Sequence, residues 1–171
     1  MPGDPTCSSG LAFMHHNTMK VRDNPLANDI RAFTFVLQLV KLTSSSIFFA
    51  ILNIYRPTSS SVAVFLNELT DTISNVCAND KLLLCSDLNC LGVDSSSINH
   101  GLAMVFDLFG LEQLVSGSTW HNNLLDVLET DDPLVVSEVN MNDARCLYDH
   151  RLICVKLIFG KSLPKPVELT P

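Results

Sequence analysis

Two long apolar runs, residues 32–42 and 47–54, stand on either side of the short polar stretch 43–46. Both runs are rich in aromatic and β-branched residues, and two such runs joined by a short polar link predict an antiparallel β-hairpin. Pro57 ends the second strand because it lacks the N–H group that a sheet hydrogen bond requires. This hairpin is the strongest strand signal in the chain, and it requires a fold that contains a β-sheet.

The segments after the hairpin alternate between helical and strand patterns. In residues 62–76 the apolar side chains recur every three or four positions, which indicates an amphipathic helix, and the serines just before it are N-cap candidates. Residues 81–89 contain a short continuous apolar run that is typical of a buried strand. Residues 94–109 return to the helical period, and Gly110 stands where a C-terminal cap belongs.

Shorter strand candidates lie at both ends of this central region. They are residues 10–16, 111–117, 124–130, 134–140 and 151–159. The order of these segments predicts an α+β protein whose sheets are covered by helices on their outer faces. That order is a strand pair, a helix, a buried strand, a second helix and a series of strands. A chain of 171 residues fits one domain. We expect a tail at residues 1–9, the domain at residues 10–159 and a Pro-rich tail at residues 160–171.

Charge and composition limit the possible partners and compartments. The formal net charge is −7, so contact with nucleic acid requires a local basic patch or a bound cation. The six cysteines lack the paired CxxC spacing of a zinc site. The N-terminus has no signal-peptide pattern, and the longest strongly apolar run, residues 47–54, is far shorter than the roughly 20 residues that span a bilayer. We expect an intracellular protein, nuclear or cytoplasmic, that is not secreted, does not bind a membrane and carries no signal for a protein partner.

Asp87 and Asn89 follow the predicted buried strand directly. Side chains two residues apart in an extended segment point to the same side, so this pair can reach one phosphate or one hydrated cation together. The alternative is that both residues only form the turn before Gly92, as Asp and Asn commonly do. On this feature alone the turn is favoured.

Three other places carry polar groups in or beside predicted strands. Asp149 and His150 stand directly before the last predicted strand, where the carboxylate can fix the tautomer of the imidazole and make it a better general base; the alternative is a surface turn. Asp126 interrupts an apolar run and faces either solvent or a polar site, because an unpaired buried carboxylate is costly. Residues 53–57 end a strand with an amide, a phenol and a guanidinium that can bind phosphate, although Tyr55 is also suited to a sheet rim.

Other enzyme classes lack their motifs. The chain has no GxSxG segment of a serine hydrolase and neither GxxxxGK[ST] nor GxGxxG for binding phosphates. His15 and His16 are adjacent, and successive side chains of a strand point to opposite faces, so they form a poor metal clamp.

The order of these segments resembles the endonuclease/exonuclease/phosphatase superfamily. More narrowly, it resembles the endonuclease domain of non-LTR (LINE-type) retrotransposons, which usually reads YRP, GDFN, GL-Q, Thr-His, L-D and SDH in this order. Here the matching segments are YRP at 55–57, SDLN at 86–89, GLEQ at 110–113, TW at 119–120, LLD at 124–126 and YDH at 148–150. The resemblance covers approximately residues 10–159.

The resemblance implies a deoxyribonuclease-like fold, which is a four-layer α/β/β/α sandwich of two packed β-sheets flanked by helices. It also implies roles for the residues that match the motifs. Asp87 and Asn89 would handle the attacking water and the phosphate oxygens. His150 would be the general base or phosphate partner, and Asp126 would orient it.

Further roles follow from the same resemblance. Asp149 would help to hold the metal, which is expected to be Mg²⁺ or Mn²⁺. Tyr55 and Thr119 would contact the substrate, which is expected to be DNA. The implied function is a metal-dependent phosphodiester hydrolase that nicks DNA. A catalytically inactive remnant with weak nucleic-acid binding, or a phosphatase of the same superfamily, are the alternatives.

The chain departs from the family pattern at several positions. Ser86 and Leu88 replace the Gly and Phe of GDFN, Tyr148 replaces the Ser of SDH, and Trp120 replaces the usual His. The family also begins with two strands, the second of which ends in a metal-binding Glu. Only nine residues precede Gly10 and none of them is Glu. We therefore expect an N-terminally truncated domain that lacks the first strands and the principal metal ligand, and little cleavage by this chain alone.

Overall fold

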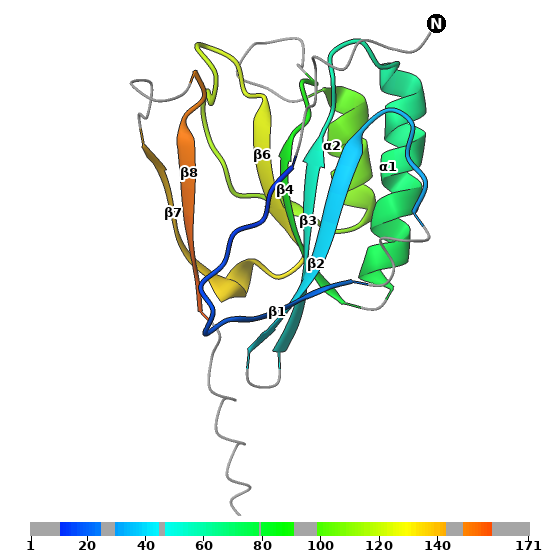
Figure 1. Cartoon of the computed structure of the whole chain (residues 1–171). Helices are drawn as coiled ribbons and strands as arrows, with labels where there is room; N and C mark the ends of the chain where they lie inside the picture. Colours follow the sequence, from blue (N-terminus) through cyan, green and yellow to red (C-terminus); the bar gives the residue numbers. More distant parts are fainter. Residues whose placement is uncertain are drawn as a thin grey trace, which may run out of the picture.

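A six-stranded sheet with the order β1-β2-β3-β4-β6-β5 forms the middle layer of the computed structural model (Figure 1). Its strands are β1 (Lys20–Asp23), β2 (Val36–Ser44), β3 (Ile47–Tyr55), β4 (Lys81–Asp87), β5 (Glu112–Gln113) and β6 (Asp126–Thr130). β3 and β4 run parallel, and all the other neighbouring pairs of this sheet are antiparallel. The structure describes residues 11–24, 30–44, 47–78, 80–90, 99–142 and 149–158. The tails expected at residues 1–9 and 160–171 lie outside them.

The predicted hairpin is confirmed. β2 and β3 pair in antiparallel register from Val36 opposite Tyr55 to Ser44 opposite Ile47. The prediction of a strand at residues 10–16 is wrong, because residues 11–16 form no strand and the first strand is β1, in the polar segment that follows. β1 lies at the sheet edge, and Val21 is its only partly buried residue. Hydrogen bonds to β2, rather than an apolar pattern, therefore define this strand.

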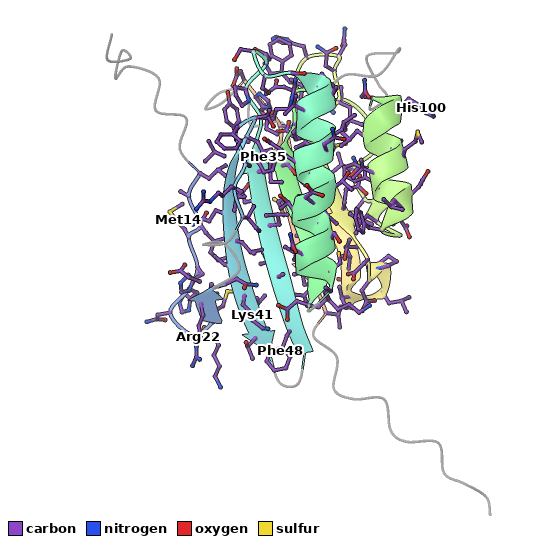
Figure 2. All side chains as sticks on the ribbon, turned by 90° about the vertical axis from the view of Figure 1, so that its right-hand side faces the viewer. Met14, Arg22, Phe35, Lys41, Phe48 and His100 are labelled. Atoms are coloured by element: carbon purple, nitrogen blue, oxygen red, sulfur yellow. The ribbon has the colours of Figure 1, made fainter. Side chains whose placement is uncertain are left out.

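Two helices, α1 (Val62–Cys77) and α2 (His100–Leu108), cover one face of the large sheet. They lie on the right in Figure 1 and toward the viewer in Figure 2. Their apolar faces share one core with the sheet, to which the helices contribute Phe65, Leu69, Ile73, Leu102 and Phe106, and the strands Leu39, Leu52, Ile54, Leu82 and Leu84. Both predicted helices are thus confirmed. None of the helices in the described ranges is long and apolar enough to cross a membrane.

Gly110 ends α2 in the predicted way. It follows the C-cap residue Phe109 and has a φ of +63°. Glycine adopts this left-handed conformation without the steric cost that a Cβ atom would add. The chain can therefore turn away from α2 toward β5.

The opposite face of the large sheet is covered by a small antiparallel sheet of β7 (Val136–Asn142) and β8 (Leu152–Leu157). A short 3-10 helix, η2 (Pro133–Val135), leads from β6 to β7. The side chains between the sheets form a second core, with Val40, Phe49, Ile51, Leu83 and Leu128 from the large sheet and Val139, Ile153 and Val155 packed against them. Two packed sheets flanked by helices were expected, and this is confirmed. Both α-helices in the described part of the chain lie on the large sheet.

Glu129, in β6, is a buried carboxylate on the face of the large sheet that the helices cover, the face to which Val127 and Leu84 also point. It is 0% exposed, pairs across the sheet with Leu84 and Gln113, and neither of its carboxylate oxygens has a hydrogen-bond partner among the described residues. Burial, followed by the negative charges of Asp107 and Glu112, raises the pKa of Glu129 to about 8 from an ordinary value of 4.5. Its proton is held more tightly in the folded state than in the unfolded chain. Stability is therefore lost as the pH rises from the ordinary value toward about 8.

Glu129→Gln is expected to prevent the loss of stability of the folded state at high pH, because a glutamine side chain carries no proton that must be released. The melting temperature of the variant should exceed that of the wild type by about 3 °C or more at about pH 9, and by much less at about pH 5. Differential scanning calorimetry at the two pH values measures both differences. The exposed Glu138 offers a matched control, and Glu138→Gln should shift the melting temperature equally at both pH values. A pH-independent effect of Glu129→Gln would show that Glu129 is not held in its neutral form.

Candidate active site

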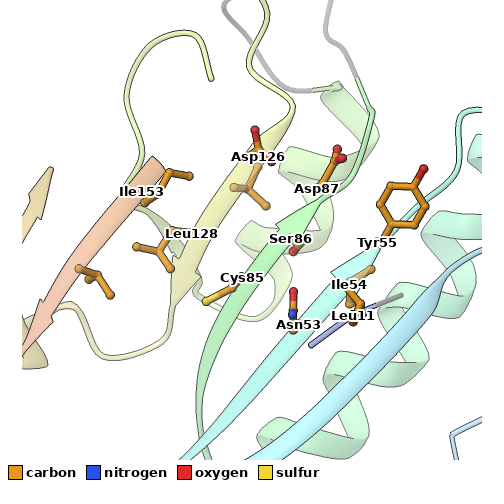
Figure 3. A pocket seen from close by; sticks show the side chains of 12 residues that line it. Leu11, Asn53, Ile54, Tyr55, Cys85, Ser86, Asp87, Asp126, Leu128 and Ile153 are labelled. Carbon is orange, nitrogen blue, oxygen red and sulfur yellow. The ribbon is translucent and has the colours of Figure 1, made fainter. Parts of the chain in front are cut away.

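Three strand ends bring Tyr55, Asp87 and Asp126 to one edge of the large sheet. Tyr55, the last residue of β3, is opposite Asp87, the last residue of β4, and Asp87 is opposite Asp126, the first residue of β6. The directions of the strands explain this arrangement, because β4 runs parallel to β3 and antiparallel to β6. Figure 3 shows the three side chains pointing toward the same end of the sheet. Each of the three is partly exposed.

His150 reaches this edge from the small sheet. It lies just before β8, and its Nδ1 is 2.8 Å from Oδ2 of Asp126. The backbone of His150 forms an isolated bridge with Trp120, and the N–H of Arg151 donates to the carbonyl of Thr119 at 2.8 Å. The turn before β6 therefore holds the segment that carries His150. The side chain of His150 is 29% exposed and that of Asp126 is 18% exposed, so both remain accessible from solvent.

Asp87, Asp126 and His150 form one charged cluster, with one ligand atom from each lying within 4.8 Å of the others. Burial, and next the charge of Asp126, raise the pKa of Asp87 to about 6, although the charge of His150 and hydrogen bonds from Asn89 lower it. Burial lowers the pKa of His150, but the hydrogen bond and charge of Asp126, with the charges of Asp87 and Asp149, raise it overall. The pKa values of Asp87 and His150 are therefore coupled, because each of the two charges shifts the pKa of the other group.

Asn89 lies in a tight turn after β4. Its φ is +48°, and its side-chain amide donates to the carbonyl of Arg56 at 3.0 Å. Arg56 is only 2% exposed, and its guanidinium donates to the carbonyls of Leu88, Asn89 and Ser60. The prediction that this guanidinium is able to bind phosphate is wrong, because its Nη1 and Nη2 groups donate to backbone carbonyls inside the fold. Arg56 instead fixes the turn that follows Asp87.

Thr119 is 1% exposed, so its hydroxyl lies inside the fold. Its Oγ1 accepts hydrogen bonds from the N–H groups of Leu125 at 3.1 Å and Asp126 at 3.0 Å. This pair of bonds fixes the start of β6 and therefore the position of the Asp126 carboxylate. Its contact with substrate stays a prediction. This positioning contact has no signal in the sequence, because it depends on the fold of the loop between β5 and β6.

Asp149 lies beside the cluster and is exposed. Its Oδ2 accepts a hydrogen bond from Nε1 of Trp120 at 3.4 Å. The cluster found in the described residues contains Asp87 in its place, so a metal-binding role for Asp149 stays a prediction. Tyr148, which replaces the Ser of the family motif, lies outside the described residues.

Two of the other departures from the family motif are accommodated inside the fold. Leu88 is 1% exposed and belongs to the core beneath the helices, and its N–H donates to the carbonyl of Leu125 at 3.0 Å. Ser86 is 7% exposed and its Oγ has no hydrogen-bond partner in the described ranges. Neither side chain therefore blocks the charged cluster from solvent.

Two hollows adjoin the charged cluster, and both are lined by Tyr55 and Asp87. The first has a volume of about 400 Å³ and lies against Asn89, Trp120 and His150. The second, of about 300 Å³, lies between the two sheets, with Ser86 and Asp126 beside apolar side chains of β6 and β8 (Figure 3). We call the first the outer hollow, because it contains both the histidine and the exposed Asp149. A substrate of nucleotide size fits such a volume.

The cluster fits a divalent metal ion. Oδ1 of Asp87 is buried and has no hydrogen-bond partner among the described residues. Mg²⁺ commonly binds to proteins through one or two carboxylates and retains several waters, and Mn²⁺ also accepts oxygen ligands. Asp87 and Asp126 supply the two carboxylates.

A scan against protein-family models and a search of curated proteins gave no match. Among solved structures, the fold and its rim of acidic residues place the chain in the deoxyribonuclease-like α+β class. The endonuclease domain of TRAS1, a telomere-specific non-LTR retrotransposon, superposes with a TM-score of 0.68 at 13% identity, over 85% of this chain and 72% of that domain. The deoxyribonuclease-like fold that the resemblance implied is therefore confirmed.

Two further solved structures share less of their architecture with the chain. They are the mannosyl-6-phosphatase Bt3783 of Bacteroides thetaiotaomicron (TM-score 0.49, 11% identity, 73% of this chain and 57% of that one) and the catalytic domain of human Nocturnin (TM-score 0.39, 15% identity, 74% and 46%). The chain thus spans about half the length of these two proteins.

Proposed function

We propose that the protein is a metal-dependent phosphodiester hydrolase that nicks DNA. The observation that carries this proposal is the hydrogen bond between Asp126 and His150 beside Asp87, at the edge of a hollow that is open to solvent. A histidine oriented by one carboxylate and adjacent to a second is suited to moving a proton during attack on a phosphate. The shared fold with a retrotransposon endonuclease domain supports DNA as the substrate.

Asp126 determines which nitrogen of His150 takes part. Since Nδ1 faces the carboxylate at 2.8 Å, the proton of the neutral imidazole is held on Nδ1, and Nε2 is free to accept a proton from water. When His150 is protonated, the same nitrogen can donate to a phosphate oxygen. The raised pKa of His150 increases the population of this protonated form near neutral pH.

Other residues of the edge position the substrate. Asp87 can accept a hydrogen bond from the attacking water, and the hydroxyl of Tyr55, at the neighbouring strand end, can donate to a phosphate oxygen. Asn89 lines the outer hollow and is held there by its bond to Arg56. A divalent ion, Mg²⁺ or Mn²⁺, bound to Asp87 and Asp126 would neutralise charge and polarise the phosphate. Such an ion also offsets the net charge of −7 when DNA approaches.

Conversion of supercoiled plasmid to open circles tests the proposal. We expect nicking in Mg²⁺ or Mn²⁺, none in EDTA, and a strong reduction in Asp87→Ala, which removes the carboxylate whose Oδ1 has no hydrogen-bond partner among the described residues. A chromogenic phosphomonoester assayed in parallel distinguishes a phosphatase from a nuclease. Circular dichroism of each sample establishes that the chain is folded. A folded protein that cleaves neither substrate would be the inactive remnant, and the proposal would be wrong.

A further inference from the structure

Trp120 is the single tryptophan of the chain and lies in the loop between β5 and β6. Its backbone is bridged to both Asn123 and His150, so the loop fixes the indole beside the charged cluster. The indole centroid is 6.4 Å from that of the His150 ring, and Nε1 donates to Asp149 at 3.4 Å. The side chain therefore has a defined place next to the histidine.

Trp120 does not serve as a core residue. It belongs to neither buried apolar cluster of the described residues, whereas its neighbours Leu124 and Leu125 are buried. It is partly exposed and lines the outer hollow together with Asp87 and His150. A large aromatic ring on the wall of an open hollow, with one polar edge anchored, is an arrangement suited to binding a flat ligand.

The charges around the outer hollow indicate the kind of ligand. Asp87 and Asp149 line it, and the whole chain is acidic, so electrostatic attraction to a phosphate backbone supplies little binding energy. Stacking of a nucleobase on an aromatic side chain contributes about 1–3 kcal/mol and does not depend on net charge. In a paired duplex both faces of a base are already stacked, so only an unpaired base has a free face.

We propose that Trp120 is a stacking platform for an unpaired nucleobase next to the phosphate that is cleaved. This inference rests on the proposed function and extends it, because it gives the enzyme a preference for single-stranded or locally unpaired nucleic acid. Trp120 acts here on substrate binding and takes no part in proton transfer. Its hydrogen bond to Asp149 keeps the ring from rotating away from the hollow.

The fluorescence of the single tryptophan reports the contact directly. His150→Ala in Mg²⁺, which still contains Trp120, is titrated with an oligothymidylate of about eight nucleotides and with an abasic tetrahydrofuran oligomer of the same length and charge. We expect quenching by the oligothymidylate and little by the abasic oligomer, with affinities that differ by about 5- to 150-fold. Equal quenching by both oligomers, or quenching by neither, would overturn the proposal.

Variants separate stacking from a structural role. In anisotropy titrations with labelled oligomers, Trp120→Ala in the His150→Ala background should bind both oligomers equally, whereas Trp120→Phe should retain part of the base preference. His121→Ala, which changes an exposed neighbour 4.5 Å away between ring centroids, should keep the full preference. If Trp120→Ala does not fold, Trp120→Phe and the quenching of the unmodified indole still decide the question. A preserved preference in a folded Trp120→Ala would show that another group binds the base.

The outcomes for the two proposals differ. Base-dependent quenching without any nicking by the wild type would support the stacking proposal and contradict the proposal that the protein is a hydrolase. Nicking of plasmid without base-dependent quenching would support the hydrolase proposal and contradict the stacking proposal.

Discussion

His150→Ala is expected to lower the rate of plasmid nicking by about 10²- to 10⁴-fold, which is the usual contribution of a positioned general acid or base. The substitution removes the one imidazole of the charged cluster and leaves Asp87 and Asp126 in place. Because the side chain of His150 is 29% exposed, the fold should tolerate the loss, and the melting temperature should change little. Initial rates of open-circle formation at saturating Mg²⁺ measure the effect. An unchanged rate in a folded variant would mean that His150 is not the base.

Two companion variants sharpen this test. Asp126→Asn keeps the shape of the side chain but removes the charge that raises the pKa of His150. A general base must be deprotonated to act, so the pH above which the nicking rate rises should be lower in this variant than in the wild type. Since the two residues act as one unit, the double variant should be little slower than the slower single variant. The exposed His16 is a matched control, and His16→Ala should nick at the wild-type rate.

Arg56→Met is expected to destabilise the protein by about 3 kcal/mol or more. The guanidinium is 2% exposed and binds three backbone carbonyls, and Met fills a similar volume without replacing these bonds. The guanidinium also lies 5.2 Å from the centre of the Phe65 ring, and this cation–π contact would be lost. Urea denaturation followed by circular dichroism measures the free energy of unfolding.

The matched control for this variant is Arg31→Met, at an exposed arginine, which should change the free energy of unfolding by no more than about 0.5 kcal/mol. Activity of a still-folded Arg56→Met should also fall, because the turn that carries Asn89 would lose its support. Equal stability of both variants would show that the carbonyls around Arg56 are satisfied in another way.

The elements that could be predicted from the sequence are those with a clear hydrophobic period. α1 and α2 each bury one face, and that face is visible as a helical repeat. The β2–β3 hairpin and the buried β4 are visible instead as apolar runs. β1 could not be found in this way, because an edge strand is held by backbone hydrogen bonds that leave no mark on the side-chain pattern. The unexpected conformation of residues 11–16 has the same origin, since apolar residues alone do not provide a pairing partner.

The candidate site was predictable only in part. Sequence position indicated that Asp87 stands at a strand end, and it placed Asp126 only within an apolar run. The family resemblance paired Asp126 with His150, which agrees with their distance of 2.8 Å. The catalytic, substrate and metal roles of these residues stay predictions. The burial of Arg56 and Thr119 was not predictable, because it depends on carbonyl and N–H groups that come together only in the folded chain. The same applies to the place of Trp120 on the wall of the outer hollow.

The bond between Asp126 and His150 joins the two sheets as well as two side chains, since one residue begins β6 and the other stands before β8. In the part of the chain that the structure describes, the small sheet consists of β7 and β8. Contacts between segments far apart in the chain form late in folding, because the entropy cost of closing the loop between them must first be overcome. The cluster is therefore complete only after the small sheet has docked. Activity should consequently appear after the bulk of the secondary structure during refolding, and on heating it should vanish before the helices melt.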